Sequence, residues 1–306
     1  MPDLIRNGVR IDDSFAEAFD MRATALVITA PDLRWARQAA VSMTGFATSV
    51  IGCGVEAAID AELAATATPD GRPGMRVLLF AGSTGELQKQ LQARVGQCVL
   101  TSAGSACYAG IEGAERLKLG DALRYFGDGW QIAKRLPGAG SDGRRYWRMP
   151  VMDGEFVCEG TTGLTKQAVG GGNLLLLARS GAAALRAAEA VAAAVAATPD
   201  AIAPFPGGIV RSGSKVGSKY KALPASTNHV YCPTLRGVVD SALDAETRAV
   251  LEVVIDGLTA DSVAAAMRAG LAAAVALGPE SGACRIAAGN YGGKLGRHHF
   301  QLRDLL

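Results

Sequence analysis

The chain has 306 residues, of which 49% are hydrophobic and 20% charged, and its 31 Lys and Arg against 29 Asp and Glu give a net charge of +2. This composition excludes a disordered or fibrous protein and is typical of a globular one with an ample core. The length indicates two lobes or one large domain, at roughly 150 residues per domain. Glycine is enriched, with 38 residues where average usage gives roughly 21, so we expect loops that turn sharply or approach a ligand closely.

The six cysteines are dispersed, with no CxxC pair and no histidine at ligand spacing. We therefore expect reduced, mostly buried thiols and no zinc or iron–sulfur site. Residues 1–13 lack the apolar segment of a secretory signal, so we expect a cytoplasmic protein. The most hydrophobic helical stretch, residues 182–197, is interrupted by Arg186 and Glu189, which indicates a packed surface helix and not a membrane span.

Apolar periodicity predicts two strand–helix steps in the first half of the chain. Residues 24–30 predict a strand, followed by a helix that begins at Pro31 and Asp32 and runs to about Thr44. Residues 75–81 predict a second strand, residues 83–95 a helix opened by Ser-Thr-Gly-Glu, and residues 97–102 a returning strand.

The second half repeats this order. Strands are predicted over residues 173–178, 250–255 and 284–288, and helices over 181–197 and 259–277. Two patterns of similar size predict an α/β (α+β) fold with two ferredoxin-like sandwich lobes of split β-α-β topology, related as a pseudo-repeat. We assign residues 1–150 to the N-terminal lobe and 151–306 to the C-terminal lobe.

Two irregular stretches, residues 128–150 and 198–235, interrupt these elements. The first contains a G-x-G-x-x-G match at residues 138–143, but it follows no strand and opens no helix, so we interpret it as a turn. Residues 208–215 resemble a P-loop with Ser and Lys reversed and no long helix after them, which excludes a Walker A motif. Structureless stretches of this length are typical of functional loops.

Two glycine-rich stretches carry basic residues and no acidic ones. They are residues 201–239, with Arg211, Lys215, Lys219, Lys221 and Arg236, and residues 281–303, with Arg285, Lys294, Arg297 and Arg303. Exposed amides and cations favour an anionic ligand, but a solvated basic face is an equally open interpretation. Nucleic acid is disfavoured because the overall charge is near neutral and no reading motif accompanies the basic residues.

Glu252 is the sharpest single candidate. It lies in Ala-Val-Leu-Glu-Val-Val-Ile, on the strand face that also carries Val250 and Val254. A carboxyl there is poorly solvated, which raises its pKa and leaves a neutral acid able to donate a hydrogen bond. The alternatives are an edge-strand glutamate that points to solvent and an ion pair with a basic residue. No Ser/His/Asp or Cys/His triad is recognisable.

Six blocks of sequence resemble the formylmethanofuran:tetrahydromethanopterin formyltransferase family. They are residues 44–51, 68–74, 96–101, 204–210, 212–215 and 288–296, and they occur in the family's order from one end of the chain to the other. The abundance of arginine and alanine points to the methylotroph branch, in which this polypeptide resembles the transferase subunit of a formyltransferase/hydrolase complex.

The resemblance implies an enzyme without a prosthetic group or metal, usually a homotetramer, that acts in the oxidation of formaldehyde to formate. It implies reversible formyl transfer between the amine of methanofuran, or of methylofuran with its polyglutamate tail, and N5 of tetrahydromethanopterin. Transfer is direct in a ternary complex, through a tetrahedral oxyanion. The resemblance thus implies that the basic stretches bind the anionic tails of the coenzymes.

The resemblance also implies site residues. Glu252 matches the glutamate of the family's V-x-E-I-V-I-N-G strand, with Asp256 in place of Asn, and becomes the donor to the oxyanion. We expect the coenzymes to be bound by Arg211, Ser212, Lys215, Lys219, Asn290, Tyr291 and Lys294. A purely structural turn at residues 204–215 stays an alternative.

Two other functions remain open from sequence. The chain could be a non-catalytic subunit that binds the coenzyme and docks a formyl hydrolase, which steady-state transfer without the hydrolase would exclude. It could also bind nucleic acid through its basic loops, which predicts salt-sensitive binding.

Overall fold

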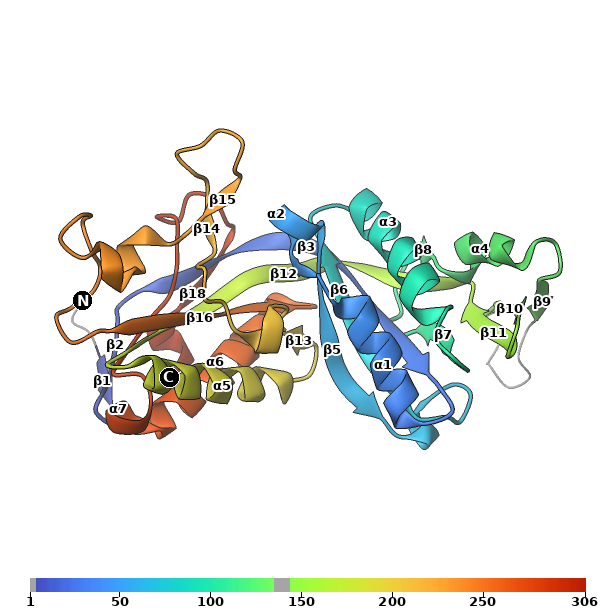
Figure 1. Cartoon of the computed structure of the whole chain (residues 1–306), viewed down its shortest axis with the longest axis horizontal. Coiled ribbons are helices and arrows are strands. Elements are labelled where there is room, and N and C mark those ends of the chain that lie inside the picture. The colour runs from blue at the N-terminus through green and yellow to red at the C-terminus, as the bar shows by residue number, and fades with distance from the viewer. Residues whose placement is uncertain (1–3, 135–143) are drawn as a thin grey trace. The chain divides into compact units, whose positions relative to one another are not determined.

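A computed structural model describes residues 4–134 and 144–306 (Figure 1). The chain forms two compact units: unit 1 comprises Met1–Asp20 and Gln167–Leu306, and unit 2 comprises Met21–Lys166. The boundaries fall inside two long strands, β3 (Phe15–Thr29) and β12 (Thr161–Ala178). The units are therefore bounded differently from the predicted lobes at residues 1–150 and 151–306, because each long strand contributes residues to both units.

Unit 2 is built on a β-α-β-β-α-β series. Its elements are β3, α1 (Leu33–Thr44), β5 (Val55–Leu63), β6 (Gly74–Ala81), α3 (Thr84–Arg94) and β7 (Ala106–Ala109). The strands pair antiparallel in the order β5-β6-β3-β7, which is the ferredoxin-like arrangement. Asp32 and Ser83 cap the two helices, as their positions in the sequence predict.

Unit 2 has further short elements. They are β4 (Thr48–Ser49), α2 (Val50–Cys53), β8 (Glu115–Lys118), α4 (Gly120–Leu123), β9 (Ile132–Lys134), β10 (Tyr146–Val151) and β11 (Gly154–Glu159), with 3-10 turns at Ala65–Ala67 and Arg124–Gly127. Strand β11 pairs parallel with β7, and β10 lies between β11 and β9.

The strand predicted over residues 97–102 is wrong. A π-helical turn, Val95–Val99, continues α3, and the returning strand begins only at Ala106. Val95 and Val99 are both buried in the core of unit 2. A short apolar run fits a buried helical turn as well as a strand, so periodicity could not distinguish them.

Unit 1 repeats the series of unit 2. Its elements are β12, α5 (Gly181–Ala196), β13 (Ala201–Ile202), β16 (Ala249–Gly257), α6 (Ala260–Ala276) and β17 (Arg285–Ala287). They pair antiparallel in the order β13-β16-β12-β17, which corresponds strand for strand to the order in unit 2. The predicted pseudo-repeat of two split β-α-β lobes is confirmed.

Additional elements extend unit 1. They are β1 (Leu4–Arg6), β2 (Val9–Ile11), β14 (Lys215–Val216), β15 (Ala225–Ser226), α7 (Gly278–Ser281) and β18 (His298–Gln301), with 3-10 turns at Pro206–Gly208, His229–Tyr231, Pro233–Leu235 and Leu302–Leu305. Strand β2 pairs parallel with β17, and β18 pairs antiparallel with the first residues of β3.

The two faces of the unit 1 sheet have different covers. Helices α5 and α6 lie on one face (Figure 1), where Leu174, Leu176 and Val253 are fully buried against them. Residues 203–248, the long connection between β13 and β16, cover the other face, where Leu175 and Leu177 pack against its side chains. Glu252 alternates with Val253 along β16 and therefore faces the long connection.

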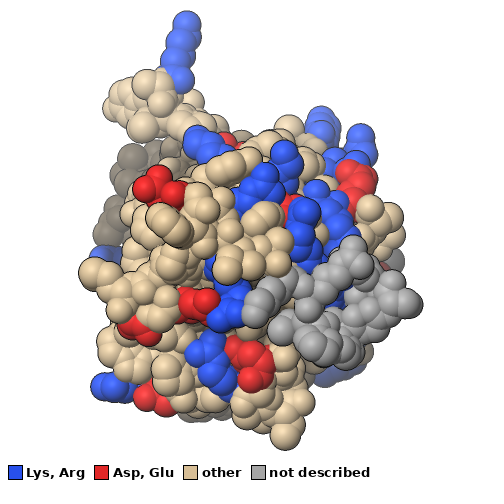
Figure 2. Space-filling model, turned by 90° about the vertical axis from the view of Figure 1, so that its right-hand side faces the viewer, with Lys and Arg blue, Asp and Glu red and all other residues tan. Residues whose placement is uncertain are grey.

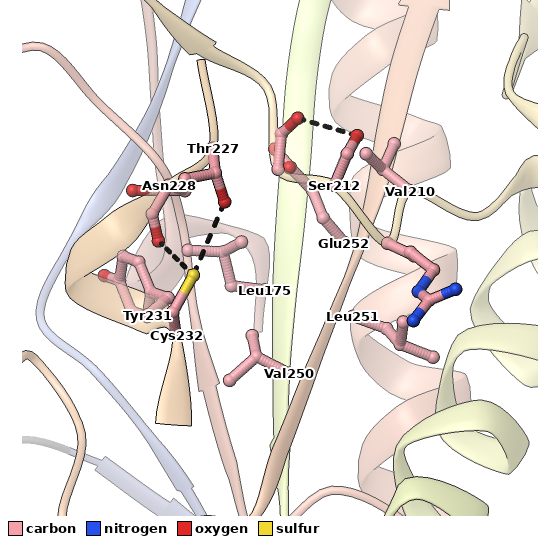
Figure 3. Close-up of a pocket in the computed structure, with 12 residues that line it drawn as sticks. Leu175, Val210, Ser212, Thr227, Asn228, Tyr231, Cys232, Val250, Leu251 and Glu252 are labelled. Carbon is pink, nitrogen blue, oxygen red and sulfur yellow. Dashed lines mark hydrogen bonds between the residues drawn. The ribbon is translucent and has the colours of Figure 1, made fainter. Parts of the chain in front are cut away.

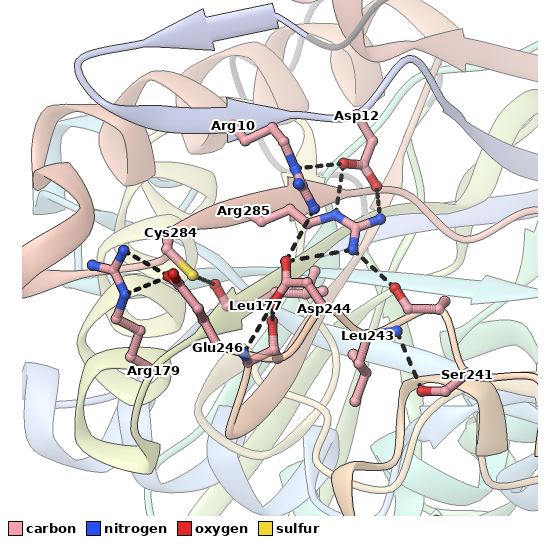
Figure 4. A network of polar contacts seen from close by, with 12 residues as sticks. Arg10, Asp12, Leu177, Arg179, Ser241, Leu243, Asp244, Glu246, Cys284 and Arg285 are labelled. Carbon is pink, nitrogen blue, oxygen red and sulfur yellow. Dashed lines mark hydrogen bonds and ion pairs between the residues drawn. The ribbon is translucent and has the colours of Figure 1, made fainter. Parts of the chain in front are cut away.

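An ionic network fastens the end of this connection to the sheet (Figure 4). Arg285 of β17 donates two hydrogen bonds of 2.7 Å to Asp12, and Arg10 of β2 donates one of 3.0 Å to Asp244. Asp244 in turn accepts the amide and hydroxyl of Thr247 at 3.0 and 2.8 Å. Because β16 begins two residues later, the network sets where the chain re-enters the sheet.

Three further sequence predictions concern the cysteines, a membrane span and the G-x-G-x-x-G match. All six cysteines are free, but only Cys107 and Cys158 are buried, so the expectation of mostly buried thiols is wrong for the four others. Among the helices of the described residues, none combines the length and hydrophobicity of a membrane span. The G-x-G-x-x-G match at 138–143 lies outside the described residues.

Basic side chains also gather on the face of unit 2 drawn in Figure 2, with acidic side chains among them. Ion pairs of this unit include Arg145 with Asp121 at 2.6 Å and Arg116 with Glu112 at 3.1 Å. Both arginines are exposed, and exposed pairs contribute about 0–1 kcal/mol to stability. Such paired charges are typical of a solvated surface.

Leu174→Ala should destabilise the protein by about 2–5 kcal/mol, because Leu174 is fully buried between the sheet and its helices and truncation leaves a cavity. Urea denaturation followed by circular dichroism measures the change. Leu185→Ala on α5, at a side chain that is 45% exposed, is the matched control and should cost far less. Equal losses in the two variants would contradict the assigned core.

Candidate active site

Glu252 is held in the middle of a paired strand. It lies opposite Leu175 of β12, and on its other side it exchanges backbone hydrogen bonds with Val210: the amide of Val210 donates to its carbonyl at 2.7 Å, and its own amide donates to the carbonyl of Val210 at 3.0 Å. Its side chain is 3% exposed. The alternative of an edge-strand glutamate that points to solvent is therefore wrong.

The Glu252 carboxyl has one hydrogen-bond partner among the described residues. The hydroxyl of Ser214 donates to Oε1 at 2.6 Å, whereas Oε2 is buried without a partner. No described Lys or Arg forms an ion pair with it, so the ion-pair alternative is not supported. Burial raises the pKa of Glu252 to about 7, against the opposing effect of Ser214. At neutral pH, a substantial fraction of this carboxyl is thus a neutral acid.

Two cavities meet at Glu252. The larger has a volume of about 180 Å³ and is lined by Asn173, Ser214, Lys215, Asn228, His229, Val230, Glu252, Gly289, Asn290 and Tyr291. The smaller has about 40 Å³, and Figure 3 shows Asn228, Tyr231 and Cys232 on one side of Glu252 and Val210 on the other. A water needs about 10–15 Å³ by this measure, so the larger cavity has room for a small reacting group.

Residues 289–291 form part of the wall of the larger cavity. The carboxamide of Asn173 holds Gly289 from both sides: it accepts the amide at 2.6 Å and donates to the carbonyl at 3.2 Å. The Tyr291 hydroxyl donates to the carbonyl of Ser214 at 3.0 Å. The residue that donates to Glu252 is therefore itself held by this wall.

The structure brings most of the predicted site residues together. Lys215, Asn290 and Tyr291 line the larger cavity with Glu252, and Arg211 and Ser212 line the smaller one. Lys219 and Lys294 line neither: Lys219 lies between β14 and β15, and Lys294 is exposed between β17 and β18. Binding of coenzyme by any of these residues stays a prediction.

Several site residues were missed by sequence reasoning. They are Glu17, Asn173, Ser214, Asn228, His229 and Tyr231. Glu17 had a usable signal, since it is an acid inside the alternating run Phe-Ala-Glu-Ala-Phe, the same argument that singled out Glu252. His229 had none: its Nδ1 lies 3.4 Å from Nζ of Lys215, a contact between residues that no motif links.

Lys215 contacts one ring nitrogen of His229. An ammonium group only donates hydrogen bonds, so Nδ1 of His229 is the acceptor in this 3.4 Å contact. The larger cavity therefore places a lysine ammonium in the same wall as the carboxyl of Glu252. Among the described residues, no group of three His, Cys, Asp or Glu side chains could hold a metal ion. Hydrogen-bond donors around a cavity suit a reaction in which negative charge develops on oxygen.

Relatives of the chain match it over nearly its whole length. A Methylorubrum extorquens protein, named as a subunit of the formyltransferase/hydrolase complex, is 58% identical, with 100% of this chain and 98% of that protein covered. The formylmethanofuran–tetrahydromethanopterin formyltransferase of Methylococcus capsulatus is 58% identical, with 99% and 100% covered, and that of Methanocaldococcus jannaschii is 45% identical, with 98% of each covered.

Solved structures agree. The formyltransferase/hydrolase complex from Methylorubrum extorquens in complex with methylofuran contains a chain with a TM-score of 0.97 and 57% identity, covering 100% of this chain and 99% of that one. The Methanosarcina barkeri formyltransferase has a TM-score of 0.91 and 41% identity, with 99% and 100% covered.

Two family models divide the chain between them. The model for formylmethanofuran-tetrahydromethanopterin formyltransferase matches residues 4–151, and that for the proximal lobe of the same enzymes matches residues 154–305. The second of these matches contains β16 and both cavities that meet at Glu252. Because the matches leave almost no residue outside them, the chain belongs to the formylmethanofuran–tetrahydromethanopterin formyltransferase family.

Proposed function

We propose that the chain catalyses reversible formyl transfer between the amine of methanofuran, or methylofuran, and N5 of tetrahydromethanopterin, which act as cosubstrates. The observation that carries the proposal is the buried, largely unpaired carboxyl of Glu252 at the junction of two cavities. The names of the relatives and the methylofuran in the solved complex support the choice of coenzymes. The bacterial relatives support a role in one-carbon metabolism of methylotrophs.

The reaction needs stabilisation of an oxyanion. In the forward direction, the lone pair of N5 attacks the formamide carbon, and the π electrons of the carbonyl move to oxygen. Glu252 in its neutral form donates a hydrogen bond to this oxygen, a kind of contact whose loss costs about 3 kcal/mol. The C–N bond to the furan coenzyme then breaks, and the proton from N5 ends on the released amine. Both coenzymes are held together throughout, so orientation supplies the remaining acceleration.

The cavity walls suit coenzyme binding. We assign Lys215, Asn290 and Tyr291 to the reacting end of the coenzymes, since they share the larger cavity with Glu252, and Arg211 and Ser212 to the smaller cavity. Lys219 and Lys294 lie outside both cavities in stretches without acidic residues, so we assign them to the anionic tails.

A non-catalytic docking subunit is the second candidate, favoured only by the name of the complex subunit. A docking function does not explain why the Glu252 carboxyl is buried beside a cavity, since such burial lowers the stability of the protein. Nucleic-acid binding is disfavoured, because Arg285, Arg297 and Arg303 of the basic stretch 281–303 pair with aspartates. The relatives are also named for formyl transfer.

We also propose partners and a compartment. Tyr125, Phe126 and Trp130 are 64–77% exposed within one short segment of unit 2, which favours burial in a homotetramer or against subunits of a hydrolase complex. Six free cysteines are typical of a reducing compartment, so we place the protein in the cytoplasm.

Substitution of Glu252 tests the proposal. In formyl transfer from formylmethanofuran to tetrahydromethanopterin, Glu252→Ala should lower kcat about a hundredfold or more, because the oxyanion loses its donor. Glu252→Gln should retain more activity, since a carboxamide also donates. Wild type that is inactive both alone and with hydrolase subunits would favour the docking function, and equal loss in both variants would indicate proton transfer by Glu252 instead.

The pH dependence should follow Glu252. The active form is protonated, so kcat should be highest below the pKa of about 7 and fall as the pH rises through it. Glu252→Gln does not titrate, and its residual activity should lose this alkaline decrease. A decrease that persists in Glu252→Gln would assign it to another group.

Replacing Lys219 and Lys294 together with Ala should raise KM about two- to fivefold for a furan coenzyme with a polyglutamate tail, because exposed pairs each contribute up to about 1 kcal/mol. The effect should shrink at high salt. Lys118→Ala in unit 2 is the matched control. An equal rise in KM for a tail-less analogue would contradict the assignment to the tails.

A further inference from the structure

One carboxylate, that of Glu17, organises the loop between β17 and β18. Glu17 lies in β3 and is 1% exposed. Four backbone amides of the loop donate to it: Tyr291 and Gly293 to Oε2 at 2.6 and 2.8 Å, and Leu295 and Gly296 to Oε1 at 2.6 and 2.7 Å. Burial alone would raise the pKa of Glu17, but the four amides outweigh it and lower the pKa to about 2. The group is therefore ionised in any enzyme assay.

The loop is shaped to present these amides. Gly292 and Gly293 have φ angles of +75° and +71°, a region that side chains disfavour, and the turn they form brings successive amides toward one anion. The loop lies outside regular strands, between β17 and β18. Side-chain acceptors therefore hold the loop in place of ladder hydrogen bonds, and Glu17 binds four of its amides.

Two hydrogen bonds connect the loop between β17 and β18 to Glu252. The amide of Tyr291 is bound by Glu17, and the Tyr291 hydroxyl donates to the carbonyl of Ser214 at 3.0 Å. The hydroxyl of Ser214 donates to Glu252 at 2.6 Å. A continuous series of contacts therefore joins the ionised glutamate to the neutral one, within unit 1.

We propose that Glu17 is a positioning residue of the active site: it holds Tyr291 against Ser214 and thereby keeps the Ser214 hydroxyl on the Glu252 carboxyl. The inference rests on the proposed function, in which Glu252 is the catalytic acid. The titratable and charged groups around Glu252 are Arg211, Lys215, His229, Tyr231, Cys232 and Tyr291, and those around Glu17 are Tyr291 and His299. None of them is altered by the main test.

Glu17→Gln is the main test. It keeps the shape of the side chain, but its NH₂ group faces two amide donors, so half of the loop's anchor is lost. We expect kcat to fall about tenfold to a hundredfold, as for a misplaced catalytic group. We also expect the alkaline decrease of the pH–rate profile to move up by about one pH unit, because a hydrogen bond that favours the charged form of Glu252 is loosened. NMR titration of ¹³C-labelled glutamate carboxyls measures the same shift without activity, with Glu252→Gln to assign the signal.

Glu56→Gln is the matched control. Glu56 is also a buried glutamate, 8% exposed, and it accepts the amide of Val50 at 2.9 Å in unit 2. We expect this variant to lose stability with an unchanged pH profile. Tyr291→Phe keeps the loop anchored and removes only the contact with Ser214, so it should shift the Glu252 titration in the same direction as Glu17→Gln. In a Ser214→Ala background, Glu17→Gln should add a smaller shift than it causes in the wild type, because the Ser214 hydroxyl through which Glu17 acts is absent.

A Glu17→Gln variant that loses activity while its Glu252 titration stays at the wild-type position would overturn the inference and leave Glu17 a purely structural residue. If Glu17→Gln does not fold, Tyr291→Phe decides, and an unmoved titration there overturns the inference equally. Failure of the proposed function gives a different result: the wild type would then transfer no formyl group, or Glu252→Ala would be as active as the wild type, whatever the Glu17 variants show.

Discussion

Burial of the Glu252 carboxyl is the constraint on which the rest of the site depends. A carboxyl removed from water without an opposite charge or several hydrogen-bond donors is stable only as the neutral acid, or at a large cost. The structure meets this requirement with apolar neighbours on β16 and β12, a single hydroxyl from Ser214, and a cover made of residues 203–248. Whatever fixes that cover also fixes the acid, which explains why ionic contacts cluster where the cover ends, around Asp244 and Arg285.

Comparison of the two repeated units shows which parts of the chain form the common scaffold and which are specific to unit 1. Both units have the same strand order, and both bury the helix-facing side of the sheet. They differ in the connection between the second and third strands, which is residues 64–73 in unit 2 and residues 203–248 in unit 1. The long connection covers the second face of the unit 1 sheet and supplies residues to both cavities at Glu252. The candidate site thus combines Glu252 of the ferredoxin-like frame with side chains from an insertion that the frame tolerates, as expected when loops complete a site on a rigid scaffold.

Sequence reasoning succeeded where the signal is local. Helix starts at Asp32, Ser83 and Thr259 were readable because a capping side chain acts within three residues, and Glu252 stood out against its apolar neighbours. It failed at Val95–Val99, where a short apolar run fits both a strand and a helical turn. It also could not predict that Ser214 meets Glu252 or that Glu17 meets residues 291–296, because these contacts join segments far apart in the chain.

The two buried glutamates of unit 1 show how strongly surroundings decide the chemistry of one residue type. Both side chains are at most 3% exposed, so desolvation opposes ionisation in each. Glu17 overcomes it with four amide donors, and Glu252, with one hydroxyl, does not. The first is therefore suited to hold a loop by charge, and the second to donate a proton or a hydrogen bond near neutral pH. Adding amides at Glu252 or removing them at Glu17 would exchange these properties, so the placement of a few backbone donors, more than the carboxyls themselves, determines which glutamate can serve as the acid.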